Sequence, residues 1–496
     1  MVNVFPYLYE YVKTNYFALC FLGVLFTLPL LKYVIKIPQP ASPRRLLGGI
    51  ILVGLVLRIF WLGFSSHELK TAWSTDQVTE NDLINIHAVN LTQGIWFVNQ
   101  AGEPSGRRPI GYPLLLGLVY KLFGVSSAAA WILNLILFAA GAYLIYLIAQ
   151  LIFGWRIGLW AAFLFSIHPI SVYTIKLTID EHLFLPLWYF GIFLLLRELK
   201  GSKIVANWFW YGVIFGYAAM TRTYAIFMTL VVGFTAFLRK QSWQRVLLSV
   251  LGVALTMQLL NLPWAIRNYK AWGAPILYAH TAHGVYIHMN AGATPEGVGY
   301  FPRPGEAGFS EEFERARLAG DIALTEKYAK REMTRWMVGH PLKFFALGTA
   351  RLLYFMHWGR KKGIWPLVYL YEEGAYDPAR PLSPSVRSIL EEWSFVFYYC
   401  IFHFFILSIL RIAFMLFRRR PPLNPASFNC LLVLGSCFLF WCLMHLIIYP
   451  DPKYRYPLEP LMMIVASYTL DSLLFSFRFE WISASLKRGV KLRPRP

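Results

Sequence analysis

The sequence predicts an all-α polytopic membrane protein with about eleven transmembrane helices. Three observations support this fold class: 57% of the 496 residues are hydrophobic, only 15% are charged, and the apolar residues gather in long stretches. A single water-soluble core cannot bury so much apolar surface, so the bilayer must act as the solvent. The first stretch is expected to stay as a transmembrane helix, because it lacks the basic start and small-residue cleavage site of a signal peptide.

Each predicted transmembrane helix is an apolar stretch of about 17 to 25 residues, which is long enough to cross the hydrocarbon layer. These stretches cover residues 16–33, 46–64, 126–150, 156–172, 182–198, 204–220, 222–238, 246–262, 393–416, 427–449 and 456–476. Two further apolar segments, 112–123 and 344–358, are expected to be partly immersed, interfacial or re-entrant helices. Residues 309–337 are rich in Glu, Arg and Lys and predict one or two amphipathic helices outside the membrane.

Five clusters of basic residues between these stretches predict the orientation. The formal charge of +21 lies in these short clusters, so we interpret them as topology anchors and expect no nucleic-acid partner. With eleven spans, all five fall on one side, which the positive-inside rule assigns to the cytoplasm. The N-terminus is then outside and the C-terminus inside. The clusters are Lys32, Lys36, Arg44 and Arg45; Arg197, Lys200 and Lys203; Arg239, Lys240 and Arg245; Arg418 to Arg420; and Lys487, Arg488, Lys491, Arg493 and Arg495.

This topology divides the chain into three regions. Residues 1–262 form an N-terminal transmembrane core with an acidic first outer loop at 65–125. Residues 263–392 form an external region with interfacial helices, and residues 393–496 form C-terminal transmembrane helices with a basic cytoplasmic tail. Because acids and arginines lie at the outer ends of the helices, we expect any chemistry at the outer face of the cytoplasmic membrane.

The first outer loop carries the candidate acids. Thr79 or Asn81 can cap a helix whose first turn contains Glu80 and Asp82, and Asp76 is a third candidate if the helix begins earlier. A carboxylate at this position can act as a general base for an acceptor hydroxyl, which accelerates reactions by about 10² to 10⁴. The simpler interpretation is that these acids stabilise the helix start and solvate the loop.

Basic side chains at the outer ends of other helices are candidates for binding a phosphate. Arg267 follows Pro263 at the end of a span, and its planar guanidinium can hold a phosphate bidentately. Arg222 lies in a short outer turn, and Lys453 and Arg455 precede the last span. Lys453 and Arg455 are equally suited to contact lipid headgroups.

Further ionisable groups accompany these residues. Asp180 and Glu181 occupy a short outer turn, where charged groups usually line a cavity. His87 lies beside the acids and can share a proton with them. Three histidines within 280–288 lack a fourth spaced ligand, so we favour structural or acceptor contacts over a metal site. All five cysteines lie in apolar stretches, and neither a disulfide framework nor a zinc motif follows from them.

A series of short motifs runs in order through most of the chain. They are the acidic first loop, Arg108-Pro-Ile-Gly-Tyr-Pro, Asp180-Glu181, Thr221-Arg222, Pro263-Trp-Ala-Ile-Arg267-Asn268, the stretch that ends at Asn290, and Tyr454-Arg455-Tyr456-Pro457. This order resembles the membrane-embedded GT-C glycosyltransferases that use polyprenyl-phosphate sugars, in the group of protein O-mannosyltransferases and lipid A aminoarabinose transferases. The PW-x-x-RN and RY-x-P elements are the most specific.

The resemblance implies the GT-C fold and an inverting transfer at the outer membrane face. An outer-loop carboxylate would deprotonate the acceptor, which attacks the anomeric carbon, and polyprenyl phosphate would leave. The family places its base, usually an Asp, a little more than two turns before a helix alanine. Counting back from Ala88 reaches Glu80, with Asp82 two positions later; these two rank equally, and Asp76 ranks below them.

The resemblance also assigns roles to the other candidates. The leaving phosphate gains charge in the transition state, so its contacts would be Arg267, Arg455, Lys453 or Arg222. The acceptor or the other site residues would be supported by Glu181, Asp180, His87, Asn268 and Asn290.

The implied partners are a polyprenyl-phosphate-linked sugar as donor, a glycan, lipid or protein as acceptor, and membrane lipid. No cofactor is required on this account; some GT-C enzymes use a divalent ion, but nothing in this sequence indicates one.

Two other classes share the need for outward basic groups. A transporter or flippase of lipid-linked sugars should show inverted repeats and broken helices at mid-membrane, whereas the motifs here gather at one face. A polymerase or ligase of diphosphate-linked glycans should have a large late outer loop and few early acids, whereas the first loop here is long and acidic. A membrane protein without catalysis is the third alternative.

Overall fold

The computed structural model describes a largely helical chain. Its described residues are 43–64, 80–106, 108–201, 208–274, 276–278, 282–294, 300–356, 384–419, 423–447 and 452–475. The predicted span 16–33, the basic tail and Asp76 lie outside them. Within the described residues the regular elements are helices, with one isolated bridge between Val98 and Pro104. The predicted all-α polytopic class is therefore confirmed.

Six of the described helices are long and apolar enough to cross a membrane. They are α2 (Pro43–Phe64), α5 (Ser127–Phe153), α8 (Glu181–Leu199), α11 (Trp243–Trp272), α17 (Pro384–Phe417) and α18 (Pro425–Met444). A seventh span results if α6 (Trp155–Ser166) is joined to α7 (Pro169–Tyr173) and the 3-10 turn η1 (Thr174–Lys176), with a bend of 52°. All seven coincide with predicted stretches.

Three other predicted spans are shorter helices. They are α9 (Trp208–Thr221), α10 (Met228–Leu238), which follows the 3-10 turn η2 (Thr223–Phe227), and α19 (Glu459–Phe475). The 14 residues of α9 measure only ~21 Å along the helix axis, which is less than the hydrocarbon thickness of about 30 Å. By length and composition, six or seven helices of the described chain qualify as membrane spans. Helices α9, α10 and α19 are too short for this criterion within the described residues, and the predicted span 16–33 lies outside them.

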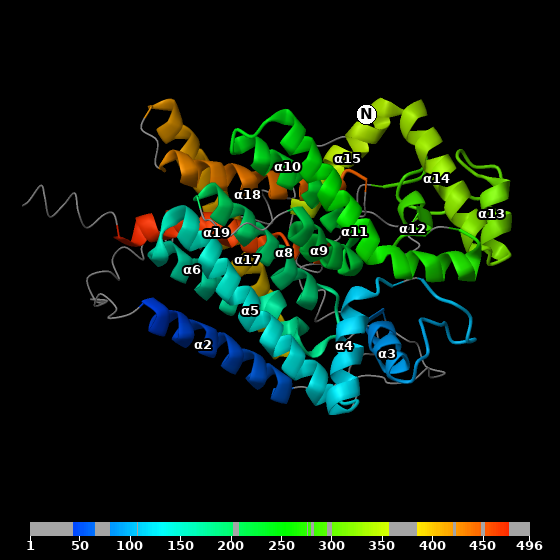
Figure 1. Ribbon diagram of the computed structural model, residues 1–496, viewed down its shortest axis with the longest axis horizontal. Coiled ribbons are helices and arrows are strands. Elements are labelled where there is room, and N and C mark those ends of the chain that lie inside the picture. Colours follow the sequence, from blue (N-terminus) through cyan, green and yellow to red (C-terminus); the bar gives the residue numbers. More distant parts are fainter. Residues whose placement is uncertain are drawn as a thin grey trace, which may run out of the picture.

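The helices run back and forth between two ends of one bundle (Figure 1). We call the end that carries α3 and α4 the site end; there, Arg222 after α9 contacts Glu181 at the start of α8, and His168 after α6 contacts Glu459 at the start of α19. We call the opposite end the basic end. It is held together by Arg239–Glu198 at 2.7 Å, Arg156–Asp471 at 3.2 Å and a hydrogen bond of 2.5 Å from Lys200 to Ser427. The described basic clusters lie at this end, apart from the candidate site residues.

The break between α6 and α7 is stabilised by a buried arginine. Pro169 begins α7 and cannot continue the hydrogen bonding of α6. Arg58 of α2 is fully buried there, and its Nη1 donates to the carbonyls of Gly54 and Ser166, both at 2.8 Å. Its Nη2 donates to the hydroxyl of Ser171 at 2.6 Å. Arg58 thereby ties α2 to both sides of the break and satisfies a carbonyl that the break leaves without a helical partner.

Helices α9 and α11 approach each other closely because glycines face the contact. Gly212 and Gly216 are four residues apart, the spacing by which small residues let membrane helices touch. A Cβ atom at Gly212 would lie 2.3 Å from the Cβ of Thr256, and one at Gly216 would lie 3.1 Å from the Cα of Met257. This contact positions the C-terminal ends of both helices, where Arg222 and Arg267 lie.

We expect Gly212→Leu to push α9 away from α11 and to lower the stability of the fold. Overpacking of this kind costs about 1–3 kcal/mol. Thermal unfolding of the purified protein measures this loss of stability. Gly49→Leu is the matched control, because Gly49 is exposed on α2 and a Cβ there meets no atom within 4 Å. Equal unfolding temperatures for the two variants would contradict the close packing.

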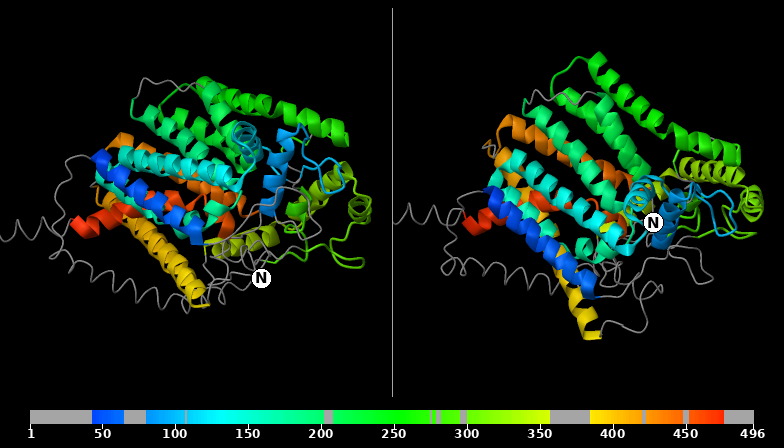
Figure 2. Two further views of the ribbon diagram at one scale, coloured as in Figure 1. Left: turned by 90° about the horizontal axis from the view of Figure 1, so that it is seen from below. Right: turned by 60° about the horizontal axis from the view of Figure 1, so that its bottom comes forward.

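The external region forms a small helical unit beside the site end (Figures 1 and 2). It contains α12 (Ala282–Tyr286), α13 (Glu311–Leu318), α14 (Ile322–Gly339) and α15 (Pro341–Met356). Tyr286, Phe313 and Ala329 form its buried core, while charged side chains cover α13 and α14. The amphipathic helices predicted for 309–337 are therefore confirmed, and the apolar segment predicted at 344–358 is largely the helix α15.

Candidate functional site

The acid-bearing helix α3 (Glu80–Thr92) packs on α4 (Gly111–Phe123), which is the short helix predicted at 112–123. Ile84 and Ala88 are buried in this contact. A Cβ at Gly117 of α4 would lie 3.0 Å from the carbonyl oxygen of Ala88, so glycine allows the close approach. The hydroxyl of Tyr120 donates to Oδ1 of Asn85 at 2.6 Å, which fixes α3 in rotation as well as in distance.

The structure begins α3 at Glu80 and so places Glu80 and Asp82 in its first turn, as predicted. The side chain of Glu80 lies outside the described part of the molecule, as does Asp76. Asp82 is only 2% exposed. Burying a carboxylate is costly, and the polar residues Asn85 and His87 of the same helix are also buried. A short helix that buries three polar side chains is typical of a functional site rather than of a solvated loop.

His87 lies beneath the loop that follows α3. Its ring is 1% exposed and stacks on the ring of Phe97 with 4.2 Å between centroids. Among the described residues, neither imidazole nitrogen has a hydrogen-bond partner. Burial and the nearby charges of Arg108 and Arg267 lower the pKa of His87 from 6.5 to about 4. His87 is therefore a neutral, buried group with free hydrogen-bonding capacity beside two arginines.

Arg267 holds this loop against the end of α11. Its Nη1 donates to the carbonyl of Ser105 and to Oδ1 of Asn268, both at 3.0 Å, and its Nη2 donates to the carbonyl of Phe97. The guanidinium also lies 4.9 Å from the ring centroid of Trp264. In the described structure, all hydrogen bonds of Arg267 go to neutral oxygens, so its positive charge is not compensated by a carboxylate.

The lowered pKa of His87 predicts a pH dependence of stability. The unfolded chain binds a proton near pH 6.5, whereas folded His87 resists protonation down to about pH 4. Stability that is fully present above pH 6.5 should therefore fall as the pH drops towards 4, by up to about 3 kcal/mol from this residue. The check is thermal unfolding at several pH values. His87→Gln should lose less stability on acidification than the wild type; parallel curves would contradict the assignment.

Asp180, Glu181 and Arg222 meet at the site end of α8 and α9. Arg222 forms an ion pair with Glu181, and its guanidinium lies 5.6 Å from the ring centroid of Tyr454. Asp180 and Glu181 are only 1% and 2% exposed. The fold thus brings together the turn that contains Asp180 and Glu181 and the turn that contains Arg222. Arg222 acts here as the counter-ion of the buried Glu181.

A second buried ion pair joins Arg455 to Glu459. Arg455 Nε lies 2.8 Å from Glu459 Oε1, and His168 Nε2 lies 2.6 Å from Glu459 Oε2. Arg455 also donates to the carbonyl of Phe355 at 2.8 Å and stacks over the ring of Tyr398. Because Arg455 is fully buried and paired with a carboxylate, its described contacts favour a role in fixing the start of α19 over direct phosphate binding.

The two candidate asparagines hold the backbone of the external region. Asn268 donates to the carbonyl of Ile276 at 2.8 Å, and neighbouring Trp264 donates to that of Tyr278 at 2.7 Å. Asn290 donates to the carbonyls of Tyr286 and Tyr300 at 3.0 and 2.8 Å. The PW-x-x-RN motif thus combines one uncompensated arginine with two residues that shape the loop after α11.

The remaining candidates are less completely described. The backbone of Lys453 lies in the 3-10 turn η3 (Pro452–Arg455), but its side chain is outside the described residues, as are His280 and the side chain of His283. Among the described residues, no group of three or more His, Cys, Asp or Glu side chains is placed to hold a metal ion. The sequence reasoning missed Arg108 and Asn85 as site residues. The sequence offers a signal for each: Arg108 begins the RPIGYP motif, and Asn85 lies on the acid-bearing helix.

These features define a polytopic α-helical membrane protein with a charged site at one end of its bundle. Residues 107–266 match the dolichyl-phosphate-mannose-protein mannosyltransferase family. The matched segment covers less than half of the chain but contains Arg108, Asp180, Glu181 and Arg222. This segment is thus similar to the family, in agreement with the resemblance seen in its motifs. No curated protein sequence matches it.

Two solved membrane enzymes are similar in structure. One is the oligosaccharyltransferase AglB from Archaeoglobus fulgidus, in complex with an inhibitory peptide and a dolichol-phosphate, with a TM-score of 0.46 and 14% identity. The similarity covers 91% of this chain and 52% of AglB, so the chain spans about half the length of that enzyme. The other is ArnT from Cupriavidus metallidurans bound to undecaprenyl phosphate, with a TM-score of 0.38, 13% identity and coverage of 90% and 81%.

Proposed function

We propose that the protein is an inverting glycosyltransferase that moves a sugar from a polyprenyl-phosphate carrier to an acceptor hydroxyl at the outer face of the cytoplasmic membrane. The proposal includes a GT-C arrangement with eleven crossings, the N-terminus outside and the C-terminus inside. It also includes the division into regions 1–262, 263–392 and 393–496. The separation of the basic end from the site end supports it, because basic clusters favour the cytoplasmic side.

One observation carries the assignment of the donor site: Arg267 has an uncompensated charge. Arg222 and Arg455 are paired with buried carboxylates, whereas the described hydrogen bonds of Arg267 end on neutral oxygens. Neutral His87 lies near both Arg267 and Arg108, because the charges of these two arginines lower its pKa. An anionic phosphate group here would gain two positive neighbours and an unused imidazole, a combination that stabilises charge on a leaving phosphate.

The acid-bearing helix supplies the base in this scheme. Asp82 or Glu80 in the first turn of α3 takes the proton of the acceptor hydroxyl, the oxygen attacks the anomeric carbon, and the bond from that carbon to the phosphate oxygen breaks. The electron pair of that bond leaves with polyprenyl phosphate, where Arg267 and Arg108 stabilise it. Glu181 and Asp180 form part of the acceptor side of the site, where Arg222 forms an ion pair with Glu181.

The test is a transfer assay on purified protein with a panel of polyprenyl-phosphate sugars and a panel of nucleotide sugars. We expect turnover with a member of the first panel only. Arg267→Ala should reduce kcat by about 10² to 10³, as expected when one transition-state donor is removed. Arg245→Ala is the matched control, because Arg245 is exposed at the basic end of the same helix. Turnover with nucleotide sugars alone would refute the proposal.

A second substitution separates phosphate binding from loop anchoring by Arg267. Arg267→Lys keeps the charge but loses the forked pair of donors that reaches the carbonyls of Phe97 and Ser105. If the charge matters for the leaving group, Arg267→Lys should retain more activity than Arg267→Ala. Equal losses in both variants would indicate that loop anchoring is the main role.

A further inference from the structure

A cluster of aromatic rings at the site end surrounds a buried histidine. His445, the last residue of the helical part of α18, is fully buried, and its ring stacks on that of Phe355 in α15 with 4.0 Å between centroids. The ring centroids of Tyr224 in η2 and Tyr454 in η3 lie 6.1 and 6.2 Å from that of His445. The ring of Trp441, one turn earlier on α18, lies 6.3 Å away. We call these five side chains the His445 cluster.

The hydrogen bond of His445 indicates which ring nitrogen carries the proton. Nδ1 lies 2.9 Å from the carbonyl oxygen of Trp441, which can only accept, so Nδ1 is the donor. Burial among rings favours the uncharged imidazole, in which the other nitrogen is an acceptor. In the part of the chain that the structure describes, this acceptor, Nε2, has no hydrogen-bond partner. A buried acceptor without a donor is unfavourable, so a ligand that supplies the donor would be stabilised here.

An unpaired donor lies beside the same cluster. The guanidinium of Arg222 lies 5.6 Å from the ring centroid of Tyr454, and its Nε has no partner among the described residues. Nη2 of the same guanidinium forms the ion pair with Glu181. Tyr224 and Tyr454 are partly exposed, so the cluster reaches the surface of the bundle near Arg222.

These two unpaired groups indicate the chemistry of the ligand. A hydroxyl group has one donor hydrogen and two acceptor lone pairs, so hydroxyls can satisfy both His445 Nε2 and Arg222 Nε. A carboxylate has acceptors alone and would leave Nε2 unpaired. The surrounding rings add flat apolar surfaces, on which the C–H groups of a sugar ring can pack. A neutral compound with several hydroxyl groups therefore fits the cluster better than an anion does.

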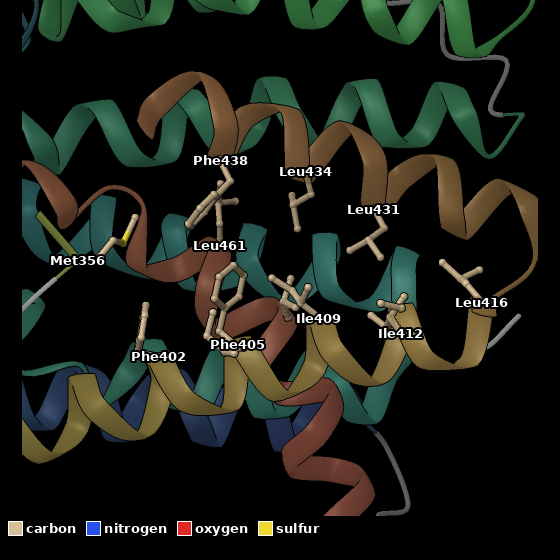
Figure 3. A pocket seen from close by; sticks show the side chains of 14 residues that line it. Met356, Phe402, Phe405, Ile409, Ile412, Leu416, Leu431, Leu434, Phe438 and Leu461 are labelled. Atoms are coloured by element: carbon tan, nitrogen blue, oxygen red, sulfur yellow. The ribbon is translucent and has the colours of Figure 1, made fainter. Parts of the chain in front are cut away.

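The neighbouring groove between α17, α18 and α19 has a different character. Met356, the residue after Phe355, lies on its wall together with leucine, isoleucine and phenylalanine side chains (Figure 3). No described side chain on this wall carries a nitrogen or oxygen atom. Hydroxyl groups therefore find hydrogen-bond partners in the His445 cluster and not in the groove.

We propose that the His445 cluster is a sugar-binding subsite, in which His445 Nε2 accepts a hydrogen bond from a sugar hydroxyl and Arg222 Nε donates one. The inference rests on the proposed function, which requires a sugar at the site end, and adds the residues that hold the sugar ring. The sugar belongs either to the donor or to the acceptor, and the experiment separates these two sources. To reach Nε2, the sugar displaces the partly exposed ring of Tyr224 or Tyr454, a side-chain rotation that is fast compared with binding.

Three variants test the role of the unpaired acceptor. His445→Phe removes both ring nitrogens but keeps a ring that can stack on Phe355. His445→Gln is the rescue variant, because its amide oxygen again provides an acceptor about as far from the backbone as Nε2. His403→Phe is the matched control. Nδ1 of His403 makes the same kind of hydrogen bond, to the carbonyl of Tyr399 at 2.8 Å, and its ring also lies next to aromatic rings, but on α17.

Binding is measured on the full chain in lipid nanodiscs with three kinds of probe: undecaprenyl phosphate, a panel of undecaprenyl-phosphate sugars, and the methyl glycosides of the same sugars. For a donor-sugar subsite, His445→Phe should weaken binding of the preferred undecaprenyl-phosphate sugar about tenfold and leave that of undecaprenyl phosphate unchanged. For an acceptor subsite, it should weaken binding of a methyl glycoside by a similar factor and leave both undecaprenyl compounds unchanged. In either case His445→Gln should recover part of the binding, and His403→Phe should bind as the wild type does.

Unchanged binding of every probe in His445→Phe would overturn the proposal. An equal loss for undecaprenyl phosphate and its sugar derivatives would overturn it too, because His445 would then support the fold or the phosphate. The same holds if His445→Gln binds as weakly as His445→Phe, or if the wild type shows no binding that depends on a sugar. Should thermal unfolding show that His445→Phe folds poorly, Tyr224→Ala takes its place and must show the same selective loss. Failure of the proposed function is distinct: it would appear as the lack of turnover with every polyprenyl-phosphate sugar, whereas these binding measurements need no turnover.

Discussion

Replacing Asp82 with Asn should lower the turnover number of sugar transfer by about 10² to 10⁴ and change KM little. The substitution removes the proton acceptor but keeps the size and the buried position of the side chain, which is 2% exposed. The measurement is steady-state transfer from the active polyprenyl-phosphate sugar. The turnover numbers of Glu80→Gln and Asp76→Asn, measured in parallel, identify which acid in the first outer loop is the base.

Glu103→Gln is the matched control for these variants. Glu103 lies in the same outer loop, but its side chain is exposed, whereas that of Asp82 is buried. We expect its substitution to leave turnover unchanged. If none of the three acid substitutions reduced transfer more than Glu103→Gln, the first loop would not contain the base, and a non-catalytic role of the chain would gain support.

Replacing Glu459 with Gln should destabilise the folded protein by about 3–5 kcal/mol, because it leaves the charge of Arg455 buried without a counter-charge. Arg455 is fully buried, and Nε lies 2.8 Å from Glu459 Oε1. His168 would lose its contact with a carboxylate oxygen as well. The double variant Arg455→Met with Glu459→Gln should recover part of the loss, which thermal or denaturant unfolding in detergent can measure.

The chain contains a matched control for this pair. Arg387 and Glu391 have the same spacing on α17 and a similar Nε to Oε1 distance of 2.9 Å, but both side chains are about a third exposed. Solvent screens such a pair, so Glu391→Gln should cost no more than about 1 kcal/mol. Similar losses for Glu459→Gln and Glu391→Gln would show that burial does not determine the strength of these pairs.

The fold class and the secondary structure of the acid-bearing region followed directly from local patterns. The seven longer spans, α3, α4 and the external helices α13 and α14 all lie where apolar stretches or helical periodicity predicted them. The full count of eleven crossings does not follow from helix length, because α9, α10 and α19 are shorter than their apolar stretches within the described residues. An apolar stretch indicates that a segment is buried in lipid or protein. The ends of its helix depend in addition on turns and on packing contacts with other segments.

The sequence by itself determined that this is a membrane protein, that its motifs resemble those of polyprenyl-phosphate-dependent glycosyltransferases, and that its basic clusters lie apart from its candidate acids. These properties depend on residue type and order along the chain. Only the tertiary structure decided how the candidates are used: Arg222 and Arg455 are neutralised by Glu181 and Glu459, whereas Arg267 binds neutral carbonyls. The physical reason is that the charge available to a ligand depends on the nearest partners, and residues such as His168 and Glu459 meet only when the bundle folds.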